Sequence, residues 1–205
     1  MIIGPKYKIA RRLGARIFPK TQTTKFSISG SANKPRPKGR RRSRGGSEYG
    51  VQLIEKQKAR FTYGLKNHQI ANYVSAVRSR QGDPRTNLFQ TLERRFDNVV
   101  FRLGLAPSRQ AARQLVTHGH IMLNGRRLNV PSHQVKIGDV VTIRLQSQSS
   151  GITNELEERL KDYQAPAWLC FDDGKKAGEV IADPLASDMP SDINLTAILE
   201  FYSRV

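Results

Sequence analysis

Between residues 51 and 103 the hydrophobic positions recur at helical spacing. Apolar residues three and four apart predict a helix over 51–62, which Gly64 would end, and a second helix over 70–77. The run Gly82-Asp83-Pro84 would close the second helix, because glycine and proline interrupt helical backbone.

A third helix is predicted to begin at Asn87, a residue type that caps helices well. Its apolar face runs from Leu88 to Leu103, and Gly104 follows as a stop. The same periodicity places a set of charged side chains on the opposite, solvent-facing side: Glu93, Arg94, Arg95 and Asp97.

The next segment changes period from helix to strand. Ser108 is a candidate N-cap of a fourth helix, and Gly119 is a candidate left-handed terminator. From His120 the apolar residues alternate, Asn124-Gly125 is a strong hairpin signal, and residues 140–145 predict another strand. Residues 87–145 are therefore expected to form two helices packed on a small curled antiparallel sheet.

The two ends of the chain have weaker patterns. Residues 1–50 lack a sustained hydrophobic period and include the basic run KPRPKGRRRSRGG at 34–46. At the other end we expect a polar connection over 146–151, a short helix over 154–163, short strands near 168–169 and 179–181, and a strand or helix over 194–201. The fold class is thus α+β: an extended basic N-terminal arm (1–46), a mostly helical or mixed domain (47–86 with 146–205) and a small module (87–145) inserted in that domain.

Charge is distributed unevenly over the 205 residues. The formal net charge is +18, yet residues 151–205 are acidic and no Asp or Glu occurs before Glu48. A strongly basic chain binds polyanions. The arm is either a solvated tail or, as we favour, a segment that becomes ordered against phosphates.

The cysteine count and the hydropathy of the chain argue against a disulfide-stabilised protein and against a membrane-spanning one. Cys170 is the one cysteine, so neither an internal disulfide nor an all-cysteine zinc site is expected. No apolar run approaches 18 residues, so a membrane-spanning helix is not expected.

The fourth helix and the hairpin concentrate candidate phosphate ligands. Arg109 and Arg113 share one helix face, His118 and His120 flank the helix exit, and Asn124-Gly125-Arg126-Arg127 forms the hairpin tip. The guanidinium fork suits phosphate oxygens, and glycine admits close backbone approach. Exposed helices also carry arginines incidentally, so these residues alone leave the question open.

The stretch Ser108–Arg127, SRQAARQLVTHGHIMLNGRR, resembles an RNA-binding module found in a small-subunit ribosomal protein, in certain pseudouridine synthases and in tyrosyl-tRNA synthetases. The sequence on either side of this stretch distinguishes among these three classes of protein. The segments LERRFDNVVFRLG at 92–104, SEYG at 47–50 and FYSR at 201–204 are similar, in this order, to the bacterial-type small ribosomal subunit protein four family.

This resemblance implies a protein that binds the 5′ domain of small-subunit rRNA, nucleates assembly of the subunit body and contributes to translational accuracy. It implies small-subunit protein five and the nearby path of mRNA as neighbours, no enzymatic activity and a place in the ribosome of the cytoplasm, or of an organelle stroma or matrix. The GPK start at 4–6 indicates that the arm is retained. Tyr7 and Ala10 stand where zinc-binding relatives have cysteines, so no metal or other cofactor is expected.

Recognition is expected to depend on RNA shape, through phosphates and 2′-hydroxyls. The expected rRNA-binding residues are basic side chains of the arm, of the first helix and of the module, with the hairpin turn. They are Lys6, Arg11, Arg12, Arg40, Arg41, Arg42, Arg44, Lys56, Lys58, Arg60, Arg94, Arg109, Arg113, His118, His120, Asn124, Gly125, Arg126 and Arg127.

Two rival functions use the same module. A pseudouridine synthase would need a catalytic domain of a few hundred residues, whereas about 60 residues follow the module. A free RNA-binding or ribosome-rescue protein tends to be shorter and would lack the flanking similarity. The acidic end is expected either to cover a sheet edge or to meet a basic neighbour, and residues 20–33 and 172–192 fit the family only loosely.

Overall fold

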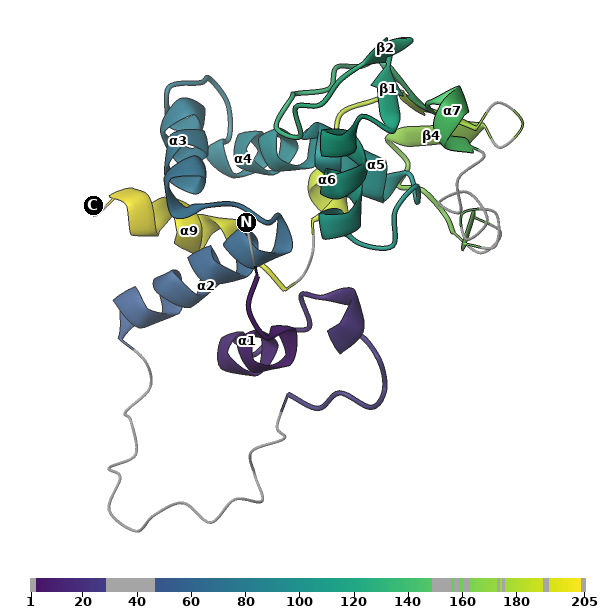
Figure 1. Ribbon diagram of the computed structural model, residues 1–205. Coiled ribbons are helices and arrows are strands. Elements are labelled where there is room, and N and C mark those ends of the chain that lie inside the picture. The colour runs from purple at the N-terminus through teal and green to yellow at the C-terminus, as the bar shows by residue number, and fades with distance from the viewer. Residues whose placement is uncertain are drawn as a thin grey trace. The chain divides into compact units, whose positions relative to one another are not determined.

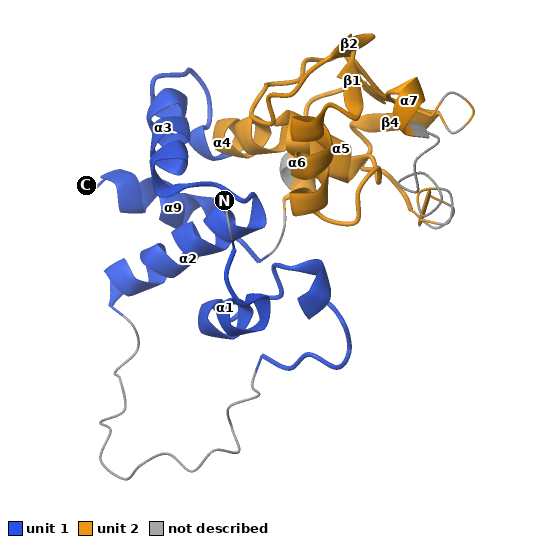
Figure 2. Ribbon diagram, in the orientation of Figure 1, with its two compact units in different colours: residues 1–85, 190–205 blue, residues 86–189 orange. Residues whose placement is uncertain are grey.

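The computed structural model describes residues 3–28, 47–148, 156, 159–160, 163–172, 174, 176–189 and 192–203 (Figure 1). It contains two compact units, which Figure 2 colours separately. Unit 1 comprises residues 1–85 and 190–205, and unit 2 comprises residues 86–189. No described helix is long and apolar enough to cross a membrane.

Unit 1 is helical. Its elements are α1 (Lys6–Leu13), the 3-10 turn η1 (Pro19–Thr21), α2 (Glu48–Thr62), α3 (Asn67–Arg78) and α9 (Leu195–Ser203). The side chain of Ser47 caps α2 by accepting a hydrogen bond from the Gly50 amide. The two helices predicted over 51–62 and 70–77 are confirmed, and the ambiguous segment 194–201 is a helix.

The buried face of α2 differs from the predicted one. Val51 is 50% exposed and Ile54 is 40% exposed, whereas Gln52, Lys56 and Ala59 are buried. Helix α9 packs against α2, and Gln52 donates a hydrogen bond to the Glu200 carboxylate of α9 at 3.2 Å. Packing against α9, which is distant in sequence, therefore determines which face of α2 is buried.

The N-terminal segment is folded where it is described. Ala10, Phe18 and Phe26 form a small apolar cluster, and the Tyr7 and Phe26 rings lie 5.5 Å apart. Residues 3–28 therefore contain a helix and a turn, not the extended arm that we expected. The basic run at 34–46 lies outside the described residues.

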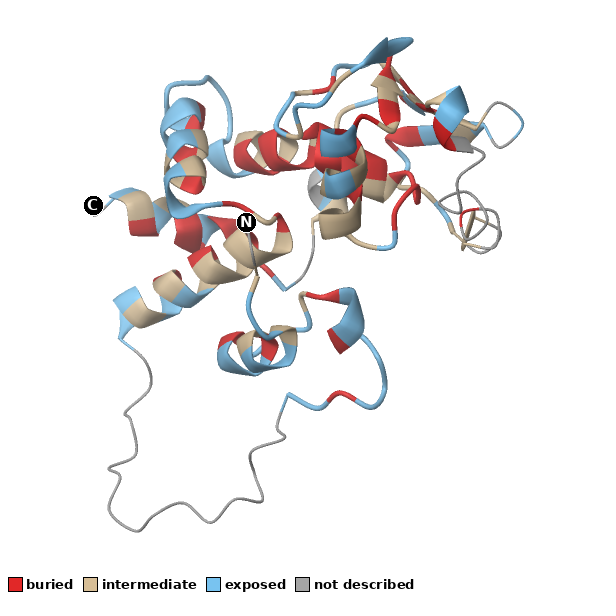
Figure 3. Cartoon of the chain, viewed as in Figure 1, coloured by how far each residue is buried: buried red, intermediate tan, exposed pale blue. Residues whose placement is uncertain are grey.

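Unit 2 packs helices on a five-stranded sheet. It holds most of α4 (Pro84–Glu93), with α5 (Phe96–Arg102), α6 (Arg109–His118), α7 (Leu145–Gln148) and the 3-10 turn η2 (Ala186–Asp188). The strands, in chain order, are β1 (Ile121–Leu123), β2 (Arg126–Arg127), β3 (Val140–Ile143), β4 (Leu169–Asp172) and β5 (Ala177–Val180). Buried side chains from α5, α6 and the sheet form one core (Figure 3).

The single helix predicted from Asn87 to Leu103 is two helices. The helix is interrupted at Arg94 and Arg95, and Arg95 has extended dihedral angles (φ −63°, ψ 135°). Residues 131–135 bind the broken backbone: the Phe96 amide donates to the His133 carbonyl, and the Val135 amide donates to the Arg94 carbonyl. Because a loop distant in sequence satisfies these groups, apolar periodicity could not reveal the break.

The C-terminal acidic segment joins the sheet. The strand order is β2-β1-β3-β5-β4, and β5 pairs antiparallel with β3, with Val141 opposite Gly178. Strands near 168–169 and 179–181 are thus present, and they cover the β3 edge, one of the two roles that we had considered. We had placed residues 146–189 with the helical domain, but they belong to unit 2. The helix expected over 154–163 lies largely outside the described residues.

The close packing of Gly178 against Leu103 gives a test of this arrangement. A Cβ at Gly178 would lie 2.5 Å from both Leu103 methyl carbons, and Leu103 is fully buried. We expect Gly178→Ala to lower the free energy of unfolding by about 1–3 kcal/mol, because the overpacked side chain has nowhere to move. Chemical denaturation measures this, with Gly174→Ala as the control; equal stability of the two variants would contradict the packing.

Candidate nucleic-acid interface

Helix α6 and the β1–β2 hairpin are held together by local hydrogen bonds. The Ser108 hydroxyl accepts a hydrogen bond from the Ala111 amide at 3.2 Å and caps α6, as predicted. Gly119 ends the helix in the left-handed conformation at φ 73°. Ala112 and Val116 are buried beneath α6, whereas Gln114, Thr117 and His118 are exposed.

The hairpin turn is built by Asn124. This residue has φ 50° and Gly125 has φ 74°, the pair of left-handed conformations that a tight hairpin requires. The Asn124 side chain donates to the Asp139 carboxylate at 2.7 Å and accepts from the Val140 amide at 2.8 Å. Asn124 therefore positions the turn, and its side chain is already occupied within the chain.

The turn presents two exposed arginines, Arg126 and Arg127. The Arg127 guanidinium donates to the His118 carbonyl at 3.2 Å and lies directly over Gly119, where any side chain would collide with it. This contact ties the hairpin tip to the end of α6. Arg126 makes no ion pair within the described ranges, so its charge faces solvent there.

A buried carboxylate connects α4, α5 and α6. The Glu93 side chain is fully enclosed and accepts hydrogen bonds from both Nε and Nη2 of Arg102, at 2.8 and 2.9 Å. The Asn98 amide donates to Glu93 at 2.8 Å, and its Oδ1 accepts from Arg109 Nε at 2.7 Å. Arg109 also lies 3.9 Å from Glu93 and stacks on the Phe101 ring. We call this group of side chains the Glu93 network.

A second buried carboxylate, Asp97, lies on α5. Arg95 is fully buried and donates to both of its oxygens, at 3.1 and 2.7 Å, and Arg113 approaches it to 3.6 Å. Burial raises the pKa of the Asp97 carboxyl, and the positive charges of Arg95 and Arg113 oppose that shift. The Asp97 carboxylate therefore holds α6 to α5 through its ion pair with Arg113. The hydrophobic pattern of the sequence had predicted that Asp97 faces solvent.

These contacts place several charged side chains elsewhere than the sequence pattern predicts, while their contacts with RNA stay a prediction. Glu93, Arg95 and Asp97 are buried instead of facing solvent, because the helix break turns them inward. Arg109 and Arg113, which we expected on the RNA face, bind carboxylates of the same unit. Arg94 forms an ion pair with Asp183.

The basic residues of α2 are also engaged. Lys56 is buried with its ammonium 4.2 Å from the centre of the Phe201 ring, and burial followed by the nearby Arg60 charge lowers its pKa. Lys58 binds Glu55 at 2.8 Å, and Arg60 donates to Gln57 and to the Leu65 carbonyl. Packing of α9 on α2 buries Lys56, so this lysine does not extend a basic face as we expected.

Helix α1 also carries exposed basic residues of the expected set. Arg11 and Arg12 are exposed and Lys6 is half-buried, in a described segment (residues 3–28) without an acidic residue. The same segment exposes three further lysines, Lys8, Lys20 and Lys25. The absence of acidic residues before Glu48 was the signal that could have added them to the prediction. Arg40, Arg41, Arg42 and Arg44 lie outside the described residues.

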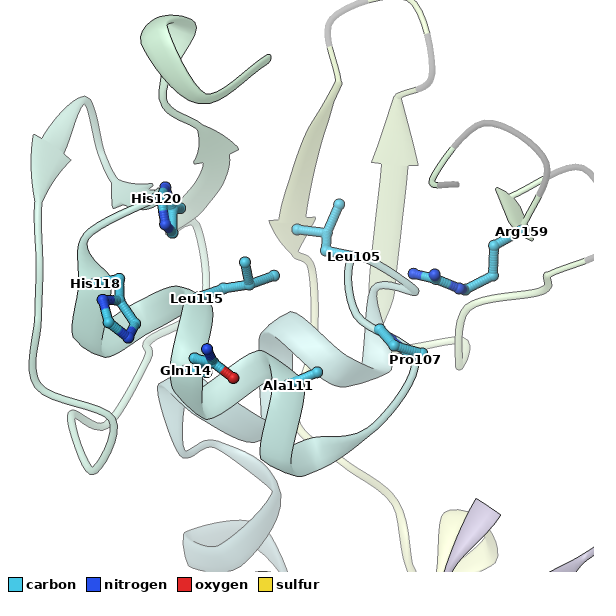
Figure 4. Close-up of a pocket in the computed structure, with 8 residues that line it drawn as sticks. All are labelled: Leu105, Pro107, Ala111, Gln114, Leu115, His118, His120 and Arg159. Atoms are coloured by element: carbon cyan, nitrogen blue, oxygen red, sulfur yellow. The ribbon is translucent and has the colours of Figure 1, made fainter. Parts of the chain in front are cut away.

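The two histidines border a pocket beside α6. His118 is exposed and His120 is half-buried, and Figure 4 shows both rings at one side of the pocket. Gln114 and Arg159, which sequence reasoning missed, also line it. The stripe Ala111, Gln114, Leu115 and His118, spaced as one helix face, was the available signal. No group of three His, Cys, Asp or Glu side chains suited to a metal occurs in the described part of the chain.

Family models match this chain in two consecutive parts. Residues 1–93 match the model described as Ribosomal protein S4/S9 N-terminal domain, and residues 94–141 match the S4 domain. The small ribosomal subunit protein uS4 of Roseiflexus castenholzii is 42% identical over 98% of each chain, and that of Syntrophomonas wolfei is 42% identical over 95% of this chain and 94% of its own. The chain belongs to the uS4 family.

The uS4 family models divide at a structural feature. The boundary between residues 93 and 94 coincides with the end of α4, immediately before the break at Arg94 and Arg95. Glu93, the last residue of the N-terminal match, binds Arg102 and Arg109 of the S4-domain match. A buried ionic contact therefore joins the two matched regions at their border.

We expect Glu93→Gln to destabilise unit 2 strongly. The substitution keeps the shape of the side chain but leaves Arg102 and Arg109 without their buried counter-charge, which costs roughly 3–5 kcal/mol. Thermal and chemical unfolding measure the loss. Glu179→Gln, at an exposed position of β5, is the matched control and should change stability by less than about 0.5 kcal/mol. Similar stability of both variants would contradict the role of the Glu93 network.

Proposed function

We propose that the chain is a structural constituent of the small ribosomal subunit that binds the 5′ domain of small-subunit rRNA. In this proposal it nucleates assembly of the subunit body and contributes to translational accuracy. The observation that carries the proposal is the similarity to small ribosomal subunit proteins uS4 over nearly the full length of both chains.

The distribution of exposed charge supports RNA binding. After the internal ion pairs are counted, exposed arginines remain at the hairpin tip, Arg126 and Arg127, and on α1, Arg11 and Arg12. An arginine guanidinium can bind two phosphate oxygens at once through a pair of parallel hydrogen bonds. Within unit 2 the hairpin arginines are on a turn fixed by Asn124, so their positions are set before any RNA arrives.

Neighbouring molecules follow from the same proposal. We place small-subunit protein five and the path of mRNA beside the chain, within a ribosome of the cytoplasm or of an organelle. The exposed apolar side chains Tyr49, Val51 and Ile54 on α2 support a protein neighbour, because such side chains are enriched at interfaces. A binding role without catalysis agrees with the relatives, whose names are those of ribosomal proteins.

Salt-dependent titration of the full chain against the 5′ domain of small-subunit rRNA tests the proposal. We expect a nanomolar Kd for this RNA and a micromolar Kd for an unrelated structured RNA of equal length at the same salt. Equal affinity for the two RNAs would contradict it, because charge alone would then account for binding.

The same titration tests the hairpin tip. We expect Arg126→Ala with Arg127→Ala to lower affinity for the 5′ domain and to reduce the slope of log K against log salt by about 2, one for each lost phosphate contact. Lys66→Ala with Arg80→Ala removes the same charge from exposed positions of unit 1 and is the control. An unchanged slope in the hairpin variant would remove these two arginines from the interface.

A further inference from the structure

We propose that the pocket beside α6 receives one unpaired base of the bound RNA. This inference rests on the proposed function and deepens it, because it adds direct reading of a base to recognition of RNA shape. The pocket has a volume of about 410 Å³, within the usual range for ligand sites, and lies entirely in unit 2.

The pocket is formed by a face of α6 whose apolar residues, Ala111 and Leu115, pack only partly against the core, while Gln114 and His118 are exposed. Arg109 and Arg113 point from one side of the helix to the carboxylates of Glu93 and Asp97. The other side carries Ala111, Gln114, Leu115 and His118, which line the pocket in succession along the helix. The contacts of Arg109 and Arg113 thus fix the rotation of α6 about its axis, and they leave Gln114 and His118 exposed at the pocket.

The walls of the pocket suit a flat aromatic ring. Leu105, Ala111 and Leu115 supply apolar surface, and the imidazoles of His118 and His120 lie with their centroids 6.1 Å apart and their planes inclined by 30°. Unpaired RNA bases stack on histidine and on other aromatic side chains. His120 is held in place by a 3.0 Å hydrogen bond between its Nδ1 and the buried Ser147 hydroxyl. A ring fixed in this way provides a stacking surface with little entropy left to lose.

The polar groups at the rim suit a base edge and its phosphate. The Gln114 amide is exposed and carries both donors and an acceptor, as the edge of a base does. Arg159 lines the side opposite the histidines and points toward Leu105 and Pro107 (Figure 4). None of the lining residues is acidic, so the pocket favours an anionic nucleotide over a cation or a basic peptide.

Nucleoside monophosphates test the pocket without rRNA. We expect each of the four, added to the full chain, to shift the imidazole NMR signals of His118 and His120 but not that of His133, an exposed histidine of the same unit. Ribose 5-phosphate, which has no base, should leave all three signals in place. Equal shifts with ribose 5-phosphate would show a phosphate site only, and no shift with any nucleotide would overturn the proposal; both outcomes leave the proposed function standing.

Variants test the pocket in the complex with the 5′ domain. We expect Gln114→Ala with His118→Ala to weaken binding roughly tenfold without changing the salt slope, since stacking and base-edge contacts are lost but phosphate contacts are not. His118→Tyr should retain affinity, because an aromatic ring remains. The control, Gln110→Ala with His133→Ala, should bind like the parent. Parental affinity of the pocket variant, or a reduced slope, would overturn the proposal and leave the pocket to a protein side chain or a phosphate.

Discussion

The Glu93 carboxylate has almost no exposed surface at the end of α4, and side chains from α5 and α6 converge on it. An ionised carboxylate in such a place is tolerated only when its oxygens are satisfied, and here hydrogen bonds from Arg102 and Asn98 satisfy them, with the Arg109 guanidinium 3.9 Å away. Together with the Asp97–Arg113 ion pair, these contacts fix α5 and α6 relative to each other. The sheet core beneath them and the pocket beside α6 both depend on that arrangement.

This constraint changes the meaning of the net charge. A value of +18 suggests a surface covered by free cations, yet six of the arginines and lysines expected to bind RNA are engaged by acids or aromatic rings: Lys56, Lys58, Arg60, Arg94, Arg109 and Arg113. Of the expected arginines and lysines that the structure describes, those that stay exposed are Arg11 and Arg12 on α1 and Arg126 and Arg127 at the hairpin tip. Internal ion pairs therefore give the protein a patterned surface, which favours selective over purely electrostatic RNA binding.

The sequence predicts what local physics determines. The capped helix at Ser108, its glycine stop at Gly119 and the Asn124-Gly125 turn were all foreseen, because each depends on the residue's own backbone preference. The break at Arg95 and the burial of Lys56 were not, and the sequence left open whether the acidic end covers a sheet edge, as β5 does on β3, because residues far along the chain decide all three. We expected charged side chains to face solvent. A buried ionic network is an exception that the spacing of hydrophobic residues does not reveal.

Hydrogen exchange of the full chain, free and bound to the 5′ domain of small-subunit rRNA, shows whether the Glu93 network or the RNA orders the module. We expect the amides of α4, α5 and α6 to be protected already in the free protein, because the Glu93 network is internal. New protection should then arise in α1 and around the hairpin tip at 124–127. Rapid exchange of α5 and α6 in the free protein, with protection gained only on RNA binding, would show that RNA and not the buried carboxylates orders the module.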